Sequence, residues 1–405
     1  MELTKEEEKV LSGEYGEAPS FAMKILVNLG ELEEADSLIP ITSAHISGVS
    51  YHTAGEALIR LLEELNRMEA RVSVPSSLNP AGMDLRRWRE IGYPEDFARK
   101  QLRIIELFSG LGINMTCSCI PYETTNRVPE IRFGDHVSWG ESNAVIYANS
   151  VIGARTNREG GISCLAASIL GKTPNWGMHL DLHRMPSLKV KVEGELTPYH
   201  YDLLGAHIGK TFNSRIVVFE GIPASADHGS LKHLGAAMAA KGGHPIFHIR
   251  GLTPEQVLIE RSEVEGRIGD SISIGPGDLE EAKGSLYPKS LNEPDVFVLG
   301  CPQFGVTEFN RLDSALGGRK LREGKRIIVY TTRALREMLP SGLLGRIIES
   351  GAEIYDDTCM VVTPLRKIGI ERVGTDSGKA AHYIPKMSQV EADLLPLEVI
   401  VDICT

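Results

Sequence analysis

The stretch KRIIVYTTRALREMLPSGLLGRIIESGAEIYDDTCMVV (Lys325–Val362) decides the fold class of this chain. Its first segment, Lys325–Thr332, is a short run rich in β-branched residues, which predicts a buried strand. Residues 333–351 have helical spacing and predict one or two helices, and Ala352–Val362 predicts a second strand. A strand, a helical crossover and another strand form a βαβ unit, which predicts a parallel sheet.

The same alternation of helix and strand patterns extends over the rest of the chain. Gly55–Ala70 has apolar residues three and four positions apart and predicts a helix, and the extended run Arg71–Ser77 follows it directly. Parallel sheets are covered by helices on both faces. We therefore expect an α/β protein built from several three-layer α/β/α lobes with largely parallel sheets.

The composition is typical of a soluble globular protein with several domains. At about 100–200 residues per domain, 405 residues predict two to four packed units. The 43 basic and 54 acidic residues leave a formal charge of −11, which disfavours general nucleic-acid binding. No apolar run approaches the roughly 18 residues of a membrane span, and the acidic start MELTKEEEKVLSG is unlike a secretory signal. These observations predict a cytoplasmic protein with no nucleic-acid or membrane partner.

Polar loops follow four of the predicted strands. The strands are expected near residues 39–41, 72–74, 113–115 and 296–299. The loops are IPITSAHISGVSYH (39–52), SSLNPAGMD (76–84), CSCIPYETTN (117–126) and CPQFG (301–305). In open α/β sheets, ligands bind beyond the carboxyl ends of the strands, so we expect the functional site in these loops.

Three cysteines lie at or near three different strand ends: Cys119, Cys301 and Cys359. Because the carboxyl ends of parallel strands share one edge of a sheet, the three thiols are expected to converge into a metal centre. A [4Fe–4S] cluster with only three protein ligands keeps one iron open as a Lewis acid, and dehydration is the natural chemistry of such a centre. Burial of the same thiols as core residues is an equally weighted alternative. The other cysteines are expected in the core, with Cys117 kept as an alternative ligand: Cys117, Cys164 and Cys404.

Two of the loops offer groups for an anionic substrate. Gly48, Val49 and Ser50 can present backbone N–H groups to a carboxylate or phosphate. Asn79 and Pro80 lie in the next loop, where the amide can donate a hydrogen bond to a substrate oxygen. Ordinary turns explain the same residue types, and both interpretations stay open.

Charged side chains flank a predicted helix over residues 144–152. Glu141 and Ser142 precede it, where the carboxylate could orient a substrate or accept a proton, although helix capping explains its position equally well. Three polar residues follow the helix: Arg155, Asn157 and Arg158. One arginine could hold a carboxylate through two hydrogen bonds, with surface ion pairing as the alternative.

The segment GTDSGKAAHY (374–383) is similar to a phosphate-binding loop but fails the P-loop pattern. Only three residues separate Gly374 from Gly378, and Ala380 stands where a magnesium-binding Ser or Thr is needed. Nucleotide hydrolysis is therefore disfavoured. Lys379 remains a candidate point charge for a phosphate or carboxylate, with a solvated surface lysine as the alternative.

Five motifs together resemble those of the aconitase X family over nearly the whole chain. They are GESNAVIYANSVIGARTNREGG (140–161), AHISGVSY (44–51), TCSCIPY (116–122), LGCPQ (299–303) and DSGKAAHY (376–383). The resemblance implies an aconitase-like fold whose lobes surround a central iron–sulfur cluster. In particular, the chain resembles large subunits from archaea. That resemblance implies dehydration of (R)-5-phosphomevalonate to trans-anhydromevalonate 5-phosphate in the mevalonate pathway to isoprenoids.

The resemblance also implies roles for individual residues. Cys119, Cys301 and Cys359 match cluster ligands, and the expected cofactor is a [4Fe–4S] cluster with one open iron. Glu141 and Ser142 are expected to be catalytic and also to bind substrate. The remaining residues expected to bind substrate are Gly48, Val49, Ser50, Asn79, Pro80, Arg155 and Lys379.

A partner is implied as well, because aconitase-type enzymes need a mobile fourth domain. Three lobes are expected over residues 1–195, 196–290 and 291–405. The swivelling domain is expected in a separate small subunit, which would also supply a serine base. The expected substrate is a phosphorylated hydroxy acid.

Two other functions stay open. Bacterial members of the same family dehydrate cis-3-hydroxy-L-proline, and the sequence alone does not fix the choice of substrate. A non-catalytic iron–sulfur or thiol sensor is the alternative from a different class. Such a sensor would need no substrate loops, so the four polar loops argue against it.

Overall fold

The stretch Lys325–Val362 forms the expected βαβ unit in a computed structural model, which describes residues 1–405 except 214, 260–267, 288–293 and 295. Strand β11 (Arg326–Tyr330) is followed by helices α14 (Arg333–Met338) and α15 (Ser341–Glu349) and by strand β12 (Glu353–Tyr355). The two strands pair in parallel. Strand β12 ends earlier than expected, so Cys359 lies in the loop beyond it.

This unit belongs to a C-terminal sheet of five parallel strands in the order β12-β11-β10-β13-β14. The other elements of this part are β10 (Val296–Leu299), β13 (Arg372–Thr375), β14 (Glu391–Leu394), α13 (Val306–Leu316), α16 (Gly378–Ser388) and α17 (Leu397–Cys404). Alternate side chains of β10 enter different cores, with Phe297 and Leu299 in one and Val298 in the other. Both faces of the sheet are therefore covered, as the run of apolar residues predicts.

The middle sheet also consists of parallel strands, in the order β8-β7-β6-β9. Its elements are β6 (Leu188–Val192), β7 (Val217–Glu220), β8 (Phe247–Ile249), β9 (Asp270–Ile274), α8 (Pro198–Thr211), α9 (His228–Gly242), α10 (Gln256–Ile259) and α12 (Pro276–Leu286). Strand β6 precedes the expected lobe boundary at 195, yet it pairs with β7 and β9, so this sheet starts earlier in the chain than expected. Helices α8 and α9 approach closely because Gly205 has no side chain; a Cβ there would lie 2.3 Å from the Leu234 carbonyl oxygen.

The N-terminal part holds a small parallel sheet in the order β3-β2-β4 and an antiparallel pair, β1 with β5. Its strands are β1 (Leu38–Pro40), β2 (Ala44–Ile46), β3 (Ser76–Leu78), β4 (Ser138–Trp139) and β5 (Lys172–Pro174). Its helices are α1 (Lys5–Ser12), α2 (Glu17–Leu32), α3 (Tyr51–Arg67), α4 (Trp88–Ile91), α5 (Glu95–Gly110), α6 (Ser142–Tyr147) and α7 (Gly161–Leu170).

Two of the strand predictions for this part were wrong. The expected strand at 72–74 is a loop, and the strand lies at Ser76–Leu78, where buried serines hid it from a search for apolar runs. The expected strand at 113–115 is reduced to a single bridge between Asn114 and Ser77. The other two strand predictions agree with the structure, because β10 covers 296–299 and β1 lies within one residue of 39–41.

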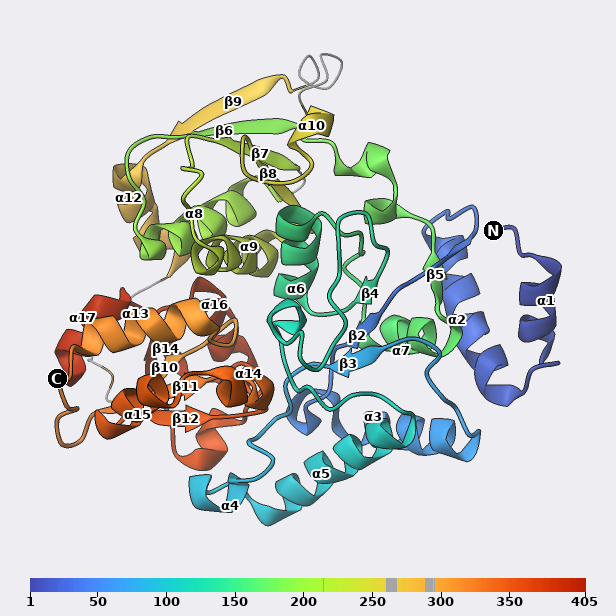
Figure 1. Cartoon of the computed structure of the whole chain (residues 1–405), viewed down its shortest axis with the longest axis horizontal. Helices are drawn as coiled ribbons and strands as arrows, with labels where there is room; N and C mark the ends of the chain where they lie inside the picture. The colour runs from blue at the N-terminus through green and yellow to red at the C-terminus, as the bar shows by residue number, and fades with distance from the viewer. Residues whose placement is uncertain (214, 260–267, 288–293, 295) are drawn as a thin grey trace.

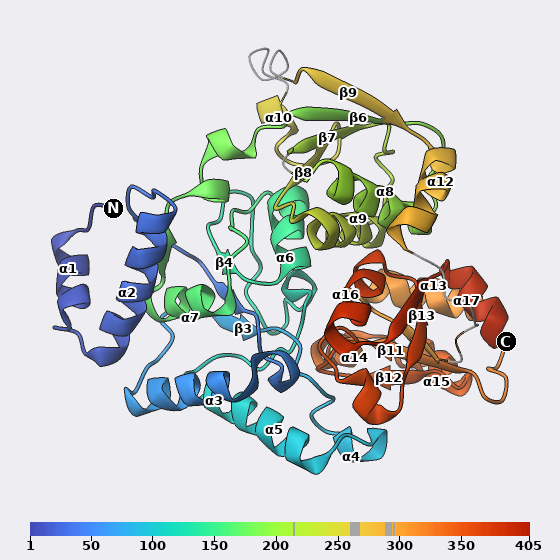
Figure 2. The same cartoon turned by 180° about the vertical axis from the view of Figure 1, so that it is seen from behind.

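The three parts meet around helix α9, as Figures 1 and 2 show from opposite sides. Lys232 of α9 is buried and forms ion pairs with Glu123 of the N-terminal part (3.0 Å) and Glu308 of the C-terminal part (2.8 Å). Burial alone would lower the pKa of Lys232, but these two carboxylates raise it above its usual value. One buried cation thus links all three parts.

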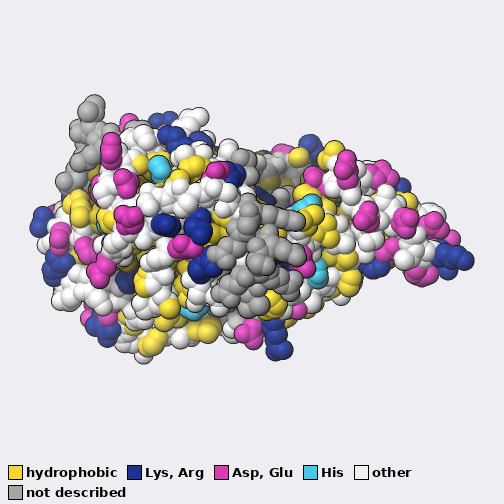
Figure 3. All heavy atoms as spheres, turned by 90° about the horizontal axis from the view of Figure 1, so that it is seen from above, with side chains coloured by type: hydrophobic (Ala, Val, Ile, Leu, Met, Phe, Trp, Pro, Cys, Tyr) yellow, Lys and Arg dark blue, Asp and Glu magenta, His cyan; other side chains and the backbone are white. Residues whose placement is uncertain are grey.

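The molecule narrows toward the N-terminal helices α1 and α2, which lie at one end in Figure 1. In the view of Figure 3, Asp and Glu side chains are spread over this narrow end, with Lys and Arg side chains among them. Pairs such as Arg67 with Glu17 join neighbouring helices there. No helix among the described residues is long and apolar enough to cross a membrane.

Candidate active site

A cavity of about 310 Å³ lies where the N-terminal and C-terminal parts meet. Its lining combines three thiols, two acids, two bases and a small apolar wall. The lining residues are Asn79, Pro80, Cys119, Gly140, Glu141, Ser142, Arg158, Glu159, Cys301, Cys359, Val361, Val362, Lys379, Tyr383 and Met387. Loops that are far apart in the sequence therefore form one site, as the strand-end positions predict.

The three cysteines of this cavity come from three separate loops. Cys119 lies just before the short 3₁₀ helix Pro121–Glu123, Cys301 is the second residue after β10, and Cys359 lies four residues beyond β12. All three residues are at most 7% exposed. Burial raises the pKa of each thiol, while the positive charge of Lys379 acts in the opposite direction.

The chemistry of the donor set fits an iron–sulfur cluster, whose protein ligands are cysteine thiolates. Among the described residues, no three His, Cys, Asp or Glu side chains are grouped closely enough to hold one ion. A single zinc ion would need thiolates within about 4 Å of each other, because each Zn–S bond is about 2.3 Å. A cluster binds each cysteine to a different iron and so accepts a wider spacing. The three cysteines that line this cavity would supply one thiolate to each of three irons.

The remaining cysteines do not line the cavity. Cys164 and Cys404 are fully buried in the hydrophobic cores of the N-terminal and C-terminal parts. Cys117 is also fully buried, and its backbone is in the left-handed region with φ of 45°. Cys117 lies two residues from Cys119 but is not part of the cavity wall.

A buried ion pair between Glu141 and Lys379 forms part of the cavity wall. Their side chains are 12% and 8% exposed, and Lys379 Nζ donates to Glu141 Oε1 and to Asn143 Oδ1. Burial alone would raise the pKa of Glu141, but Lys379 and a hydrogen bond from Asn79 lower it below its usual value. Glu141 is therefore a carboxylate at neutral pH, and Lys379 is not the solvated surface lysine of the alternative interpretation.

Glu141 does not cap the helix that it precedes. It occupies the N-cap position of α6, yet its side chain makes no capping hydrogen bond. Its Oε2 instead accepts from Asn79 Nδ2 at 2.6 Å, and its Oε1 accepts from Ser142 Oγ at 3.3 Å. The carboxylate thus turns into the cavity, which removes the capping explanation.

His45 fixes the orientation of Asn79. His45 Nε2 lies 3.0 Å from Asn79 Oδ1, and His45 Nδ1 lies 2.7 Å from Ser77 Oγ. Burial lowers the pKa of His45 to about 4, so the ring is neutral at pH 7. Because Asn79 Oδ1 only accepts, the His45 proton is on Nε2 and Nδ1 accepts from Ser77. The amide of Asn79 is then held with its NH₂ group toward Glu141.

The loop before α16 ties Lys379 to the cysteine site and to the middle part. Ser377 Oγ donates to the Cys301 carbonyl oxygen, and it accepts from Ala380 N at 3.1 Å as the cap of α16. Gly378 N donates to Asp202 Oδ1 at 2.7 Å. The backbone around Lys379 is therefore positioned from two other segments of the protein.

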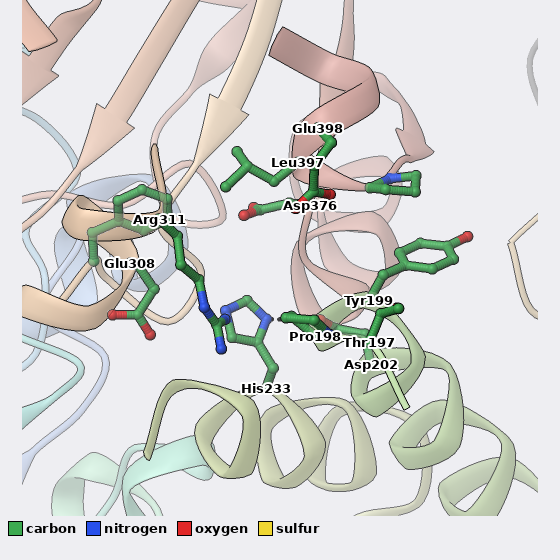
Figure 4. Close-up of a pocket in the computed structure, with 12 residues that line it drawn as sticks. Thr197, Pro198, Tyr199, Asp202, His233, Glu308, Arg311, Asp376, Leu397 and Glu398 are labelled. Atoms are coloured by element: carbon green, nitrogen blue, oxygen red, sulfur yellow. Dashed lines mark hydrogen bonds and ion pairs between the residues drawn. The ribbon is translucent and has the colours of Figure 1, made fainter. Parts of the chain in front are cut away.

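A second small cavity, of about 50 Å³, lies where the middle part meets this loop. Figure 4 shows His233 of α9 reaching toward the segment that carries Asp376, with Glu308 and Arg311 beside it. His233 Nδ1 lies 2.7 Å from Asp202 Oδ2. Burial alone would lower the pKa of His233, but the Asp202 carboxylate raises it to about 9. The loop before α16 therefore contacts the ion pair that His233 and Asp202 form in the middle part.

The structure does not bring all the expected substrate residues into the cysteine cavity. Gly48 borders a separate cavity of about 270 Å³, lined mainly by apolar residues of α3 and α7. Val49 is buried, and Ser50 Oγ donates to the Val362 carbonyl oxygen at 2.8 Å and caps α3. Ser50 therefore does not line the cavity itself but holds the backbone of Val362, which does.

Arg155 also lies outside the cysteine cavity. Its guanidinium donates to the His179 carbonyl oxygen at 2.8 Å and pairs with Asp181, which matches the ion-pair alternative. Arg158, three residues along the same loop, lines the cavity instead. The sequence could not separate the two arginines, because both follow the same helix.

Several groups of the site were not expected from the sequence, and two of them join its parts: His45 and Asn143. His45 stands within the motif AHISGVSY, but nothing in that run indicates its contact with Asn79. Asn143 accepts from Lys379 and donates to the Cys119 carbonyl oxygen at 2.7 Å, so it joins the ion pair to a cysteine loop. Both contacts are between segments distant in sequence and have no local signal.

Family models match almost the entire chain. The model described as aconitase X first domain matches residues 1–182, the second domain matches 186–284, and the third domain matches 294–405. The matches occur in the order of the domain names. They therefore cover all three parts of the structure.

Curated relatives of similar length share the sequence from end to end. The chain is 44% identical over 393 residues to the phosphomevalonate dehydratase large subunit of Methanothermobacter thermautotrophicus, covering 96% of this chain and 95% of that protein. The protein of the same name from Methanocaldococcus jannaschii is 43% identical, with 96% and 97% covered. The cis-3-hydroxy-L-proline dehydratase of Hypocrea jecorina is 32% identical over 96% of this chain but only 66% of its own length.

A solved structure has the same fold. The crystal structure of Thermococcus kodakaraensis aconitase X in its holo form superposes with a TM-score of 0.90, at 36% identity and with both chains covered completely. The expected aconitase-like α/β fold with largely parallel sheets is confirmed.

Proposed function

The chain belongs to the aconitase X family, and from this membership we propose that it is the large, catalytic subunit of a phosphomevalonate dehydratase. The reaction is loss of water from (R)-5-phosphomevalonate to give trans-anhydromevalonate 5-phosphate, in the mevalonate route to isoprenoids. The C2–H and C3–O bonds break, a C2=C3 double bond forms and water leaves. Relatives of this name match the chain over almost their whole length.

The single observation that supports this proposal most strongly is the composition of the cysteine cavity. Three buried thiols face the same 310 Å³ space as a carboxylate held by a lysine. Cys119, Cys301 and Cys359 would hold an iron–sulfur cluster, which we take to be [4Fe–4S] with one open iron. Such a group supplies a Lewis acid that makes a hydroxyl group a better leaving group.

Lys379 is suited to bind an anionic group of the substrate. Its ammonium group has three protons, and among the described residues two side chains accept from it, Glu141 and Asn143. One proton remains for a substrate oxygen. Arg158, on the wall of the same cavity, supplies a second cation. A phosphorylated hydroxy acid has two anionic groups, so two separate cations match it.

Glu141 and Ser142 are the proposed catalytic residues of this chain. The Glu141 carboxylate is ionised and fixed by Lys379 and Asn79, so it can orient the reacting hydroxyl group by accepting a hydrogen bond from it. Ser142 lines the cavity next to it, and its hydroxyl group can exchange the 3.3 Å hydrogen bond to Glu141 for one to substrate. Pro80 completes the wall, while Gly48, Val49, Ser50 and Arg155 support neighbouring structure.

The proposal includes a small-subunit partner. The names of the similar relatives contain the words large subunit, and the longer hydroxyproline dehydratases extend beyond the region that this chain matches. We place the swivelling domain and the serine base that removes the C2 proton in that partner. We also propose a division into three lobes near residues 187 and 290, which moves the first expected boundary from 195 to a point before β6. The six cysteines, none in a disulfide, agree with a cytoplasmic location.

The test is a substrate comparison with the complete enzyme. The chain is produced together with its small subunit without oxygen, and water loss is followed by product mass for (R)-5-phosphomevalonate and for cis-3-hydroxy-L-proline. We expect turnover of phosphomevalonate only. Turnover of hydroxyproline alone would replace the substrate and keep the family chemistry. No turnover of either by an iron-loaded complex would refute the proposal.

A further inference from the structure

One buried amide side chain contacts the loops of all three cavity cysteines. Gln303 is fully buried and lies two residues after Cys301. Its Oε1 accepts a hydrogen bond from Cys119 N at 2.8 Å. Its backbone N–H points at the Cys119 sulfur, with N to Sγ at 3.2 Å. Gln303 therefore joins the Cys301 loop directly to the Cys119 loop.

The other end of the amide reaches three backbone carbonyl oxygens. Gln303 Nε2 lies 3.0 Å from the oxygens of Thr331 and Thr358 and 3.3 Å from that of Cys117. Thr358 immediately precedes Cys359. An NH₂ group facing three carbonyls, with the amide oxygen facing an N–H, allows only one orientation of the side chain. Both the oxygen and the NH₂ group of this amide therefore have hydrogen-bond partners, and each contacts a segment that carries a cysteine.

We propose that Gln303 is a positioning residue that sets the spacing of Cys119, Cys301 and Cys359 for the iron–sulfur cluster. It touches no reacting atom; it acts through the backbone of the segments that carry the thiols. The role of the cluster rests on the proposed function, whereas the spacing of the thiols is a property of the chain itself. Removing a group that orients a metal ligand typically lowers the metal affinity about 10–100-fold.

A second buried glutamine provides the matched control. Gln101 is also fully buried, and it bridges the N-terminal loops by donating to the Val49 carbonyl oxygen at 3.1 Å and accepting from Tyr51 N and Gly82 N at 2.9 and 3.0 Å. It makes no hydrogen bond to a cysteine segment in the part of the chain that the structure describes. Q101E and Q303E make the same isosteric change in the same degree of burial.

The experiment measures iron retention in the complete complex. Wild type, Q303E and Q101E are reconstituted anaerobically with Fe²⁺ and sulfide, and the rate of iron loss to a chelator is followed by absorbance. We expect Q303E to lose iron about 10–100-fold faster, because a carboxylate oxygen replaces the NH₂ group that holds the Thr331, Thr358 and Cys117 carbonyls. Q101E is expected to lower the melting temperature comparably and to release iron at the wild-type rate.

A second measurement does not depend on any cluster. In the apo complex, the rates at which iodoacetamide labels individual cysteines are read by mass spectrometry. Q303E is expected to increase the labelling of Cys119 and Cys359 but not that of Cys164, which lies in the core. If wild type takes up no iron, the cluster proposal fails while this labelling still decides the role of Gln303.

Three outcomes would overturn the inference. The first is wild-type iron retention and labelling in Q303E, and the second is equal iron loss in Q101E. Where Q303E is not recovered folded, Q303N is used, because the shorter amide keeps its chemistry but cannot reach both loops. Failure of both variants to fold is the third, since Gln303 would then determine the fold and not the spacing of the thiols.

Discussion

Replacing Lys379 by methionine should destabilise the protein strongly, and replacing Glu141 at the same time should remove about half of that cost. The two side chains are 8% and 12% exposed, so either charge left alone would be buried without its partner. Breaking such a pair typically costs about 3–5 kcal/mol. K379M and E141Q should each fall in this range.

The double variant K379M/E141Q separates the ion pair from its neighbours. Without either charge, the remaining cost comes from Asn143 Oδ1, which loses its donor, and such a loss is worth about 1–3 kcal/mol. The amide oxygen introduced by E141Q can still accept from Asn79 Nδ2, which makes this substitution a conservative partner in the cycle. The double variant should therefore be more stable than either single variant.

The measurement is the apparent free energy of unfolding in urea, for the four proteins at pH 7 in one buffer. Single costs that add in the double variant would show that the two residues act independently. Single costs below about 1 kcal/mol would show that the pair is solvated, contrary to its burial. Either result would refute the reasoning that treats this pair as a buried and coupled ion pair of the cavity wall.

Individual contacts of His233, Arg158 and His45 lead to three more predictions. His233 has a folded pKa of about 9 beside Asp202, against 6.5 in the unfolded chain, so its contribution to stability should be complete below about pH 6.5 and be lost as pH rises through 9. The difference in unfolding free energy between wild type and H233Q should therefore shrink over this range, and a constant difference would contradict the assignment. R158Q should raise KM for phosphomevalonate about 10-fold or more through loss of a charged hydrogen bond, whereas R155Q, the matched change outside the cavity, should leave KM unaltered. H45F should lower kcat up to about 100-fold, because the Asn79 amide would no longer be held in one orientation. The pH profile between pH 6 and 8 should not change, because a pKa of about 4 keeps the His45 ring neutral there, and a shifted profile would mean that His45 titrates in catalysis.

The sequence predicted the architecture well where the pattern was apolar. Strand β10 and the strand β11 within Lys325–Val362 are mainly continuous apolar runs, and their positions agree closely with the structure. The strand expected over 352–362 is shorter, because β12 covers only Glu353–Tyr355 and polar residues follow it. The strand at Ser76–Leu78 was misplaced because two of its three residues are serines, one of which contacts His45. Buried polar residues in a strand are recognisable only from partners that the sequence does not reveal.

The candidate site was predicted in part, for a similar reason. Strand-end position placed Asn79 near the loops of Cys119 and Cys301, because that rule depends on topology alone, and these residues line one cavity. Glu141 and Lys379 line the same cavity, but they were candidates on other grounds: the position before a helix and a likeness to a phosphate-binding loop. The assignment of Arg155 in place of Arg158 depended on side-chain direction, which a loop sequence does not specify. Gln303 and His45 act through contacts between distant segments, so only the folded structure reveals them.

The most direct test of the central claim is the iron and acid-labile sulfide content of cysteine variants. The complex is purified without oxygen as wild type and as C119S, C301S, C359S, C117S and C164S. Our account predicts about four irons per chain in wild type, the same in C117S and C164S, and loss of the cluster in each of the other three. Full iron content in C301S, or loss of iron in C117S equal to that in C119S, would contradict it.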